Sequence, residues 1–429
     1  MPKDNPQNAT QIQASLRRRW LYLMPVVFVT YSLAYLGRSN FGFGAAAGLA
    51  ASLHITESRA AFLGSVFFLG YFLFQVPAAS YALRRSATRL VFFALISWGV
   101  LSGLTGIIRN YWMLVADRLL LGVAESLIFP SMLILLTHWF TRTERSRANA
   151  ILILGNPVTV TWMAAVTGYL IRAVGWQMTF VIEGIPSVLW AIVWVAVARD
   201  HPSQVGWLPE KASAQLAEAL EREQAALPAY TSFSEAMRVR GVLLLCFQYF
   251  CWSFGVYGLS LWIPEMIRSG SKRGIEQVGM LSAAPFLLGV FLMLVVAYFS
   301  DRVQHRKMFV WPFLMLSGAG LFCSFAAAGS HFWIGYAALI VAGGAMYAPY
   351  GPFFAIVPEM LPSTVAGKVM ALINTFGALG GFAGVWLVGW LQALTGSARA
   401  GFLSMSMALI AAGTITLFLP STRRSPRPA

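Results

Sequence analysis

Arg38 is the residue whose type and position most clearly imply chemistry. It lies in an apolar run from Trp20 to Leu53 that contains no other charged residue. A charge inside a membrane-spanning helix costs roughly 2.5–3.5 kcal/mol on insertion scales, so such a residue normally faces a bundle interior or a wet cavity. Its guanidinium offers a planar fork of donors that matches a carboxylate. We expect Arg38 to anchor an organic anion; the alternative is a side chain that extends to the outer membrane interface.

Glu125 is the second charged residue of interest within an apolar run. It follows Arg118 by seven residues, which places the two on nearly one helix face but about 10 Å apart along the axis, so we expect no direct pair. Burial raises and a nearby cation lowers the proton affinity of a carboxyl group. Glu125 is therefore our candidate proton site; the alternative is a fixed ion pair with Arg118 or Arg38. Asp117 and Arg118 are expected to fix helix packing at the inner gate or near the interface.

The composition predicts that these residues sit in a bundle of membrane-spanning helices. Of 429 residues, 58% are hydrophobic and only 11% are charged, with a mean hydropathy of +0.67. Soluble domains carry about 25% charged residues. Spans need about 20 apolar residues, and helices satisfy their own backbone in lipid. We expect twelve spans: 20–48, 58–83, 90–108, 112–138, 148–170, 177–198, 241–267, 275–299, 308–328, 332–358, 365–393 and 399–420.

The distribution of basic residues predicts the orientation and explains the net charge of +15. With both termini cytoplasmic, most of the 31 Lys and Arg residues fall in short inner segments, as the positive-inside rule requires. They would meet anionic lipid headgroups there, so the charge needs no nucleic acid. The first span is expected to act as its own insertion signal, without a cleaved peptide. Three cysteines and five histidines show no ligand spacing, so we expect no metal and no cofactor.

The chain divides into two related halves. The predicted domains are an N-terminal segment (1–19), a six-helix bundle (20–198), a linker (199–240) with an amphipathic helix from about Glu210 to Ala226, a second six-helix bundle (241–420) and a tail (421–429). Pro130 and Pro352, and likewise Gly155 and Gly377, are separated by 222 residues. Such symmetry is typical of transporters whose site lies between two bundles near the membrane midplane.

Two loop motifs resemble the signature of the major facilitator superfamily. Asp301-Arg302 followed by Arg306-Lys307 resembles one copy, and the segment from Arg84 to Arg89 resembles the other. This first copy is degenerate, because Leu83 stands where the acid is expected. Arg118-Leu-Leu-Leu-Gly122 resembles the fourth-helix signature of the same superfamily. The resemblance implies an all-α membrane fold and gating or structural roles for Arg84, Arg118, Asp301 and Arg302.

Longer stretches resemble the bacterial anion:cation symporters, which carry sugar acids. They include Tyr35-Leu-Gly-Arg-Ser-Asn40, Gly122-Val-Ala-Glu125 and Asp200-His-Pro202. Two further segments, Leu154 to Thr159 and Met346 to Ala355, look closest to the carriers of hexonates and 2-ketohexonates, such as galactonate and 2-ketogluconate. The family usually reads Tyr-Leu-Asp-Arg in the first span, whereas this chain has Gly37 before Arg38. In this family that acid is thought to take part in proton coupling.

The resemblance also implies which neutral side chains bind the hydroxyls of a sugar acid. Each can hydrogen-bond a polyol, and the alternative for each is a contact between helices. These residues are Tyr35, Tyr71, Asn156, Gln248 and Asn374. On the seventh span, Tyr249, Ser253 and Tyr257 recur on one face beside Gln248.

The expected function is a secondary carrier of the bacterial inner membrane, not an enzyme. It would import a hexonate or 2-ketohexonate with protons by alternating access, as a monomer, with the substrate and the proton as its partners. A facilitator without coupling is the alternative, because Gly37 replaces the usual Asp. A transporter-like anion sensor is a remote third. No Gly-x-x-x-x-Gly-Lys loop is present, so ATP is not the expected driver.

Overall fold

The computed structural model describes residues 6–46, 49–225, 227, 232–271, 275–327, 331–395 and 399–419. The regular structure within these ranges is helical. The helices are α1 (Pro6–Ala46), α2 (Leu49–Ser52), α3 (Glu57–Arg84), α4 (Ala87–Ile107), α5 (Tyr111–Ser126), α6 (Ile128–Trp139), α7 (Arg145–Val197), α8 (Glu210–Ala225), α9 (Phe233–Met237), α10 (Arg240–Ser271), α11 (Ile275–Val303), α12 (Trp311–Ala327), α13 (Phe332–Tyr347), α14 (Tyr350–Met360), α15 (Ser363–Thr395) and α16 (Arg399–Leu417), with short 3₁₀ turns η1 (Pro202–Gln204) and η2 (Arg306–Phe309).

The helices account for the twelve expected spans. Eleven described helical segments are long and apolar enough to cross a membrane. The twelfth is contained in α7, which holds two spans separated at Gly175, where φ is +80° and the helix is interrupted. Only glycine adopts this backbone region without steric cost, so Gly175 permits the turn between the fifth and sixth spans.

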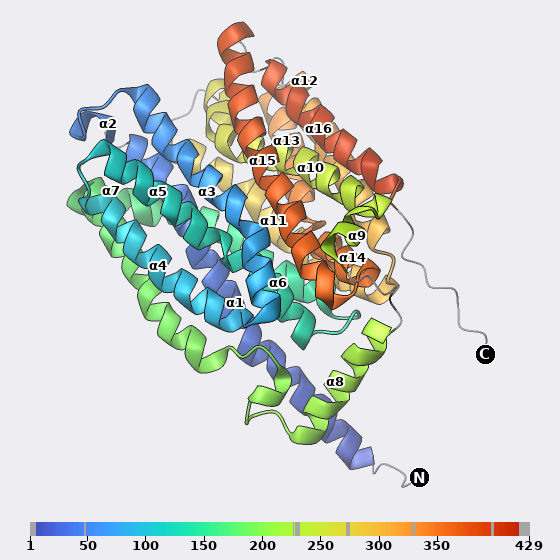
Figure 1. Cartoon of the computed structure of the whole chain (residues 1–429). Coiled ribbons are helices and arrows are strands. Elements are labelled where there is room, and N and C mark those ends of the chain that lie inside the picture. The colour runs from blue at the N-terminus through green and yellow to red at the C-terminus, as the bar shows by residue number, and fades with distance from the viewer. Residues whose placement is uncertain are drawn as a thin grey trace.

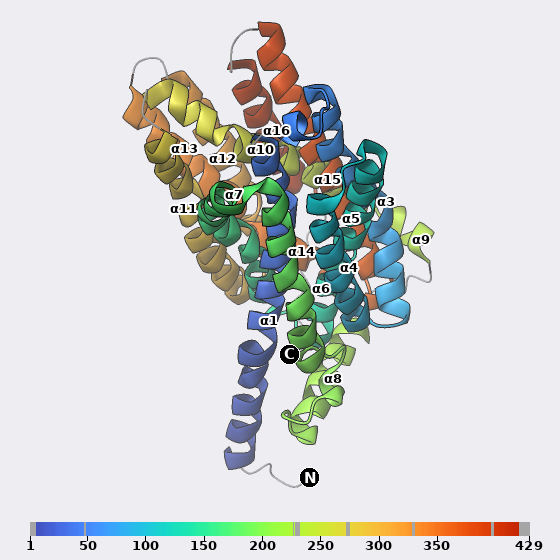
Figure 2. The same ribbon diagram turned by 90° about the vertical axis from the view of Figure 1, so that its left-hand side faces the viewer.

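Two six-span halves stand side by side. Figure 1 shows α1 to α7 on one side and α10 to α16 on the other, with the first turns of α1 and α8 at the same end. Figure 2, turned by 90°, separates α11, α12 and α13 from α3, α4 and α5. We call the end that carries α8 the linker end. The halves meet through α3 with α15 and through α7 with α11 and α14.

The internal symmetry suggested by the spacing is visible in corresponding helix breaks. The fourth span of each half is broken, between α5 and α6 at Leu127 and between α13 and α14 at Ala348–Pro349. Pro130 and Pro352 are each the third residue after the break, in the first turn, where proline is tolerated. A Cβ on Gly155 would meet Ser32 of α1 at 3.0 Å, and one on Gly377 would meet Tyr249 of α10 at 2.2 Å. The paired glycines thus allow equivalent helix approaches.

The linker folds against the first half. Its helix α8 buries Ala212 and Leu216, while the indole of Trp207 just before it stacks on Tyr22 at 4.9 Å and on Trp139 at 5.9 Å between ring centroids. These contacts fix the helix beneath the bundle rather than leaving it as a tether.

Candidate functional site

A small polar cavity lies where the two halves meet. It has a volume of about 10 Å³, close to the space of one water molecule. Seven helices line it: α1, α3, α6, α7, α10, α14 and α15, so both halves contribute. The lining residues are Tyr31, Tyr71, Phe129, Ile153, Asn156, Tyr249, Ser253, Tyr257, Tyr350, Asn374, Gly377 and Ala378.

Asn374 links the halves across this cavity. Its Nδ2 donates to Gln75 Oε1 at 2.6 Å and to the Tyr71 hydroxyl at 3.2 Å, so α15 of the second half is joined to α3 of the first. All three side chains are buried. Three of the five predicted hydroxyl-binding residues, Tyr71, Asn156 and Asn374, thus line one cavity.

Asn156 carries an acceptor that no described residue uses. Its Oδ1 is buried and has no hydrogen-bond partner among the described residues, on a side chain that lines the cavity. An unsatisfied buried polar atom costs about 1–3 kcal/mol. A ligand hydroxyl or a water molecule would satisfy this oxygen.

Gln248 and Tyr35 are placed differently. Gln248 is fully buried, and its Nε2 donates to Thr416 Oγ1 of α16 at 2.7 Å, so it joins two helices of the second half instead of lining the cavity. This is the helix–helix contact that the sequence left open as an alternative. Tyr35 is buried on α1, one turn after the cavity residue Tyr31.

Arg38 and Gly37 lie outside the side chains that the structure describes. The backbone of α1 continues through both, from Pro6 to Ala46. The anchoring role of Arg38 therefore remains a prediction from the sequence.

Glu125 and Arg118 lie within the fourth span at different depths. Glu125 is buried two residues before the break at Leu127, near the middle of this span. Arg118 is nearer the end opposite the linker, where its guanidinium lies 4.4 Å from the ring centre of Phe41 and 5.3 Å from that of Phe67. Asp117 accepts a hydrogen bond from Thr105 Oγ1 at 2.6 Å. Both residues hold neighbouring helices together. The inner gate was one of the two places expected for Arg118, but the structure places this residue in the opposite half of the span.

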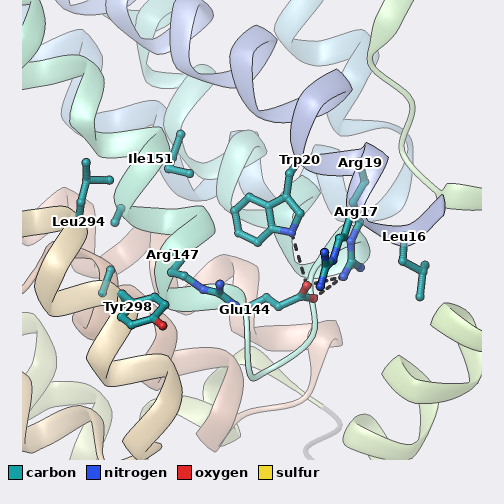
Figure 3. Close-up of a pocket in the computed structure, with 11 residues that line it drawn as sticks. Leu16, Arg17, Arg19, Trp20, Glu144, Arg147, Ile151, Leu294 and Tyr298 are labelled. Carbon is teal, nitrogen blue, oxygen red and sulfur yellow. Dashed lines mark hydrogen bonds and ion pairs between the residues drawn. The ribbon is translucent and has the colours of Figure 1, made fainter. Parts of the chain in front are cut away.

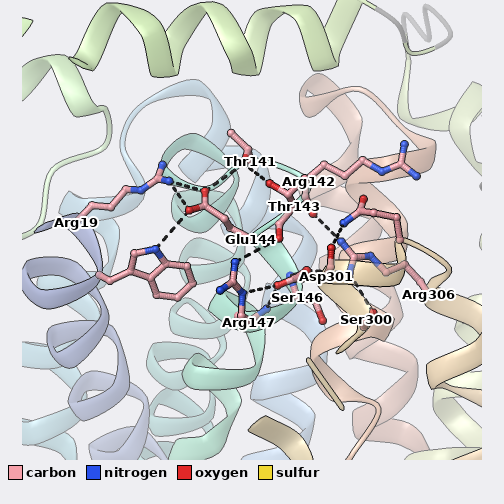
Figure 4. Close-up of polar contacts among 12 residues, drawn as sticks. Arg19, Thr141, Arg142, Thr143, Glu144, Ser146, Arg147, Ser300, Asp301 and Arg306 are labelled. Atoms are coloured by element: carbon pink, nitrogen blue, oxygen red, sulfur yellow. Dashed lines mark hydrogen bonds and ion pairs between the residues drawn. The ribbon is translucent and has the colours of Figure 1, made fainter. Parts of the chain in front are cut away.

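Charged residues close the linker end of the interface between the halves. Asp301 of α11 accepts from the backbone N–H groups of Ser146 (3.2 Å) and Arg147 (3.0 Å), which open α7, and from Arg147 Nε at 3.0 Å (Figure 4). A carboxylate at a helix N-terminus is favoured by the helix dipole and the free N–H groups. Asp301 thus caps a helix of the opposite half.

Arg306 and Glu359 extend this closure. Within the second half, Arg306 donates from Nη1 to Asp301 at 2.8 Å and from Nε to Glu359 at 2.9 Å. Its Nη2 donates to the carbonyl of Arg142 in the first half at 2.6 Å (Figure 4). Glu359 also lies 3.4 Å from Arg142 Nη2. We call Arg142, Ser146, Arg147, Asp301, Arg306 and Glu359 the linker-end gate.

Among the described residues, the first copy of the loop motif makes no charged contact with the other half; its Ser86 and Thr88 bind the Asp200 carboxylate instead. Leu83, in the place of the acid, packs against α15, its Cδ1 lying 3.2 Å from a Cβ built on Gly367. Arg84 and Arg302 are exposed, and Arg302 lies over the ring of Tyr298 at 4.5 Å. Gating by these two arginines stays a prediction.

The linker helix supplies contacts that the sequence did not predict. Glu223 accepts from the backbone N–H of Arg142 at 2.8 Å and from Arg145 Nη2 at 3.3 Å, and the Oε1 of its neighbour Gln224 accepts from the backbone N–H of Ser363 at 2.8 Å. The first two residues belong to the first half and Ser363 begins α15 in the second. Adjacent Glu and Gln at the end of an amphipathic helix gave only a weak signal, because their partners, two backbone N–H groups and the Arg145 side chain, lie far along the chain.

Comparison with known proteins identifies the fold and the class. The model of the Major Facilitator Superfamily matches residues 27–385. A putative tartrate transporter of Agrobacterium vitis is 30% identical over 419 residues, covering 96% of this chain and 92% of that protein. A quinolone resistance transporter of Acinetobacter baumannii is 28% identical, covering 90% and 91%.

A solved structure agrees in architecture. That of the proton:xylose symporter XylE bound to 6-bromo-6-deoxy-D-glucose superposes with a TM-score of 0.72 at 15% identity, covering 93% of this chain and 96% of that one. The chain is a multi-pass membrane transporter and not an enzyme. By the extent of the family match, it belongs to the Major Facilitator Superfamily.

Proposed function

We propose that this transporter carries a hydroxylated carboxylate, a sugar acid such as a hexonate or 2-ketohexonate, across the bacterial inner membrane together with protons. The observation that carries the proposal is the cavity between the halves, where tyrosines, Asn156 and Asn374 offer neutral hydrogen-bonding groups to one small volume. Such groups suit a polyol chain. The relative from Agrobacterium vitis is a putative tartrate transporter, and tartrate is also a hydroxy acid, which supports this substrate class.

Arg38 would hold the carboxylate of this substrate. α1 supplies the cavity residue Tyr31 and continues through position 38. Seven residues separate them, which is about two helical turns on nearly the same face. The fork of a guanidinium would therefore bind the acid group while the amides and tyrosines bind the hydroxyls.

Glu125 would exchange the coupling proton. It is buried near the middle of its span, beside a helix break. A buried carboxyl group becomes charged only if a nearby change in charge offsets the cost of its ionisation. Binding of an anion near Arg38 and protonation of Glu125 would offset each other, which links the two events.

Transport would proceed by alternating access. A cavity of about 10 Å³ cannot hold a six-carbon acid, so the halves must separate for the substrate to enter. The closed linker-end gate identifies which end would stay shut while the other opens. The orientation expected from the basic residues, with both termini cytoplasmic, would make this the state that precedes uptake from outside.

Gly37 favours a second candidate function, a facilitator without proton coupling. The anion:cation symporters that this chain resembles usually carry an acid at this position, and glycine cannot bind a proton. In this reading Gly37→Asp adds proton dependence to a carrier that otherwise only equilibrates its substrate.

The test is uptake into proteoliposomes of radiolabelled galactonate, 2-ketogluconate and tartrate, with and without an inward proton gradient. We expect accumulation above equilibrium for one of these acids, lost in Arg38→Ala and partly kept in Arg38→Lys, which retains charge without the fork. Arg222→Ala, which changes an exposed arginine of the linker helix, serves as the control. Equilibration without accumulation would establish the facilitator, and failure of all three acids to move or bind would reject the substrate class.

A further inference from the structure

A second, larger cavity at the linker end has no part in the proposed transport site. It has a volume of about 650 Å³ and lies at the side of the bundle, where α1 and α7 of the first half meet α11 of the second (Figure 3). Every lining residue comes from the first or last turns of a span or from the loop before α7. The cavity therefore lies at the level where these helices leave the apolar layer.

The polar side of this cavity has an excess of positive charge. Arg17, Arg19 and Arg147 line it with a single carboxylate, that of Glu144. Arg19 is bonded to Glu144 and to the carbonyl of Trp139 at 2.7 Å, so these two charges offset each other. Arg17 is exposed, and the Arg147 side chain is 38% exposed although its Nε contacts Asp301. Arg302, over the ring of the lining residue Tyr298, adds another cation at the rim.

The other side of the cavity is apolar and continues along the membrane. Leu294 lines it, and exposed side chains follow on α11 at Leu287, Phe291, Leu294 and Tyr298. These residues are spaced by four, three and four positions, which places them on one helix face. Trp20 and Tyr298 lie where the apolar and polar parts of the cavity meet. Both residue types are enriched at membrane–water interfaces.

We propose that this cavity binds the headgroup of an anionic phospholipid, with an acyl chain lying along the Leu287–Tyr298 face of α11. A basic pocket between helices at the headgroup level is the arrangement that binds such lipids. A free anion would use the arginines but not the exposed apolar face beneath them. Because α1 and α7 belong to one half and α11 to the other, the bound lipid favours the state in which the linker-end gate is closed.

Native mass spectrometry of the full transporter in mild detergent tests the proposal. Phosphatidylglycerol or phosphatidylcholine of equal chain length is added, and lipid-bound protein is counted for the natural protein, Arg17→Gln and the control Arg18→Gln, which changes an exposed neighbour outside the cavity lining. We expect phosphatidylglycerol to be retained about fivefold more than phosphatidylcholine. Arg17→Gln should reduce this preference severalfold, while Arg18→Gln should keep it.

Three results would overturn the proposal. They are equal retention of the two lipids, an equal loss in Arg18→Gln and Arg17→Gln, and displacement of phosphatidylglycerol by millimolar inorganic phosphate, which would make the cavity a site for free anions. Because Arg17 is exposed, its substitution leaves the fold intact, and equal melting temperatures of the two variants verify this. The measurement uses no transport substrate, so its outcome is independent of the sugar-acid proposal.

Discussion

Asn374 and Gln248 show how differently two buried amides can be used in one transporter. Asn374 lines the central cavity and bonds across the halves, whereas Gln248 bonds Thr416 within the second half. In the proposed transport cycle, only Asn374 has neighbours that move apart when the halves separate. Its hydrogen bonds can therefore be exchanged for those of a substrate, while the Gln248 bond is expected to persist through the cycle.

The first prediction compares these two residues. Asn374→Ala removes a group that would bind a substrate hydroxyl and leaves Gln75 without its partner, so we expect the KM for the transported acid to rise about tenfold, equivalent to about 1.4 kcal/mol. Gln248→Ala should leave KM unchanged but reduce stability by about 1 kcal/mol. Uptake kinetics and thermal unfolding of both variants measure this. A raised KM in Gln248→Ala alone would show that the cavity is not the substrate site.

The second prediction concerns Glu125 and rests on proton coupling. Glu125→Gln keeps the shape and hydrogen-bonding capacity of the side chain but cannot release a proton. We expect gradient-driven accumulation to be lost, while exchange of substrate across a membrane without a gradient stays within about twofold of the natural rate, since exchange needs no net proton movement. Accumulation that survives the substitution would move the proton site elsewhere; loss of exchange as well would indicate a structural ion pair.

At the scale of elements, the contacts that join the halves at the linker end differ between the start of α7 and the start of α15. On one side Asp301 caps α7, the helix of the opposite half, with a charged group. On the other side the corresponding position is Leu83, and the N–H of Ser363 at the start of α15 is instead bound by Gln224 of α8. Glu223 binds the first half at the same time. The linker helix thus takes the place of the acid that the first loop motif lacks.

The third prediction tests whether α8 holds the two halves together through its contacts with both. Glu223→Gln combined with Gln224→Ala removes its contacts to the N–H groups of Arg142 and Ser363, so these amides should exchange with deuterium severalfold faster in peptides covering 141–148 and 361–366. The control is Glu218→Gln, which changes an exposed pair with Arg222 on the same helix. Unchanged exchange in the double variant would mean that α8 is a passive tether.

The sequence predicted the helices and their grouping better than their contacts. Apolar runs of about 20 residues give spans directly. The 222-residue offset of Pro130 and Pro352 suggested that the halves are related, and the structure places both prolines just after equivalent helix breaks, which the sequence did not predict. Periodicity says which residues share a face but not which helix lies opposite. Gln248 and the cavity residues Tyr249 and Ser253 are neighbours in sequence with different partners, and the partners of Asn374 lie about 300 residues away.

For the whole molecule, Asp301 is the residue on which the balance between closed and open states should depend most. Its carboxylate accepts hydrogen bonds from two backbone N–H groups and the Arg147 side chain of the first half, and so joins the halves. It also accepts from Arg306 of the second half and thereby orients this arginine, which donates to the carbonyl of Arg142. Separation of the halves breaks the contacts to the first half. Every one of them is weakened when the charge is removed.

Asp301→Asn should therefore shift the population toward the state open at the linker end. A charged hydrogen bond contributes about 1.5–3 kcal/mol against about 0.5–1.5 for a neutral one, so the closed-to-open ratio should fall about tenfold. Spin labels at Arg84→Cys and Met308→Cys, exposed positions of the two halves, report the distance across this end once the exposed Cys323 is replaced by Ser. Leu83→Ala is the matched control and should change the ratio less, because it removes apolar contact at the corresponding position without a charge. If the two variants shifted the distances equally, the closure would depend on packing rather than on the charge of Asp301, and the asymmetry between the two loop motifs would have no role in transport.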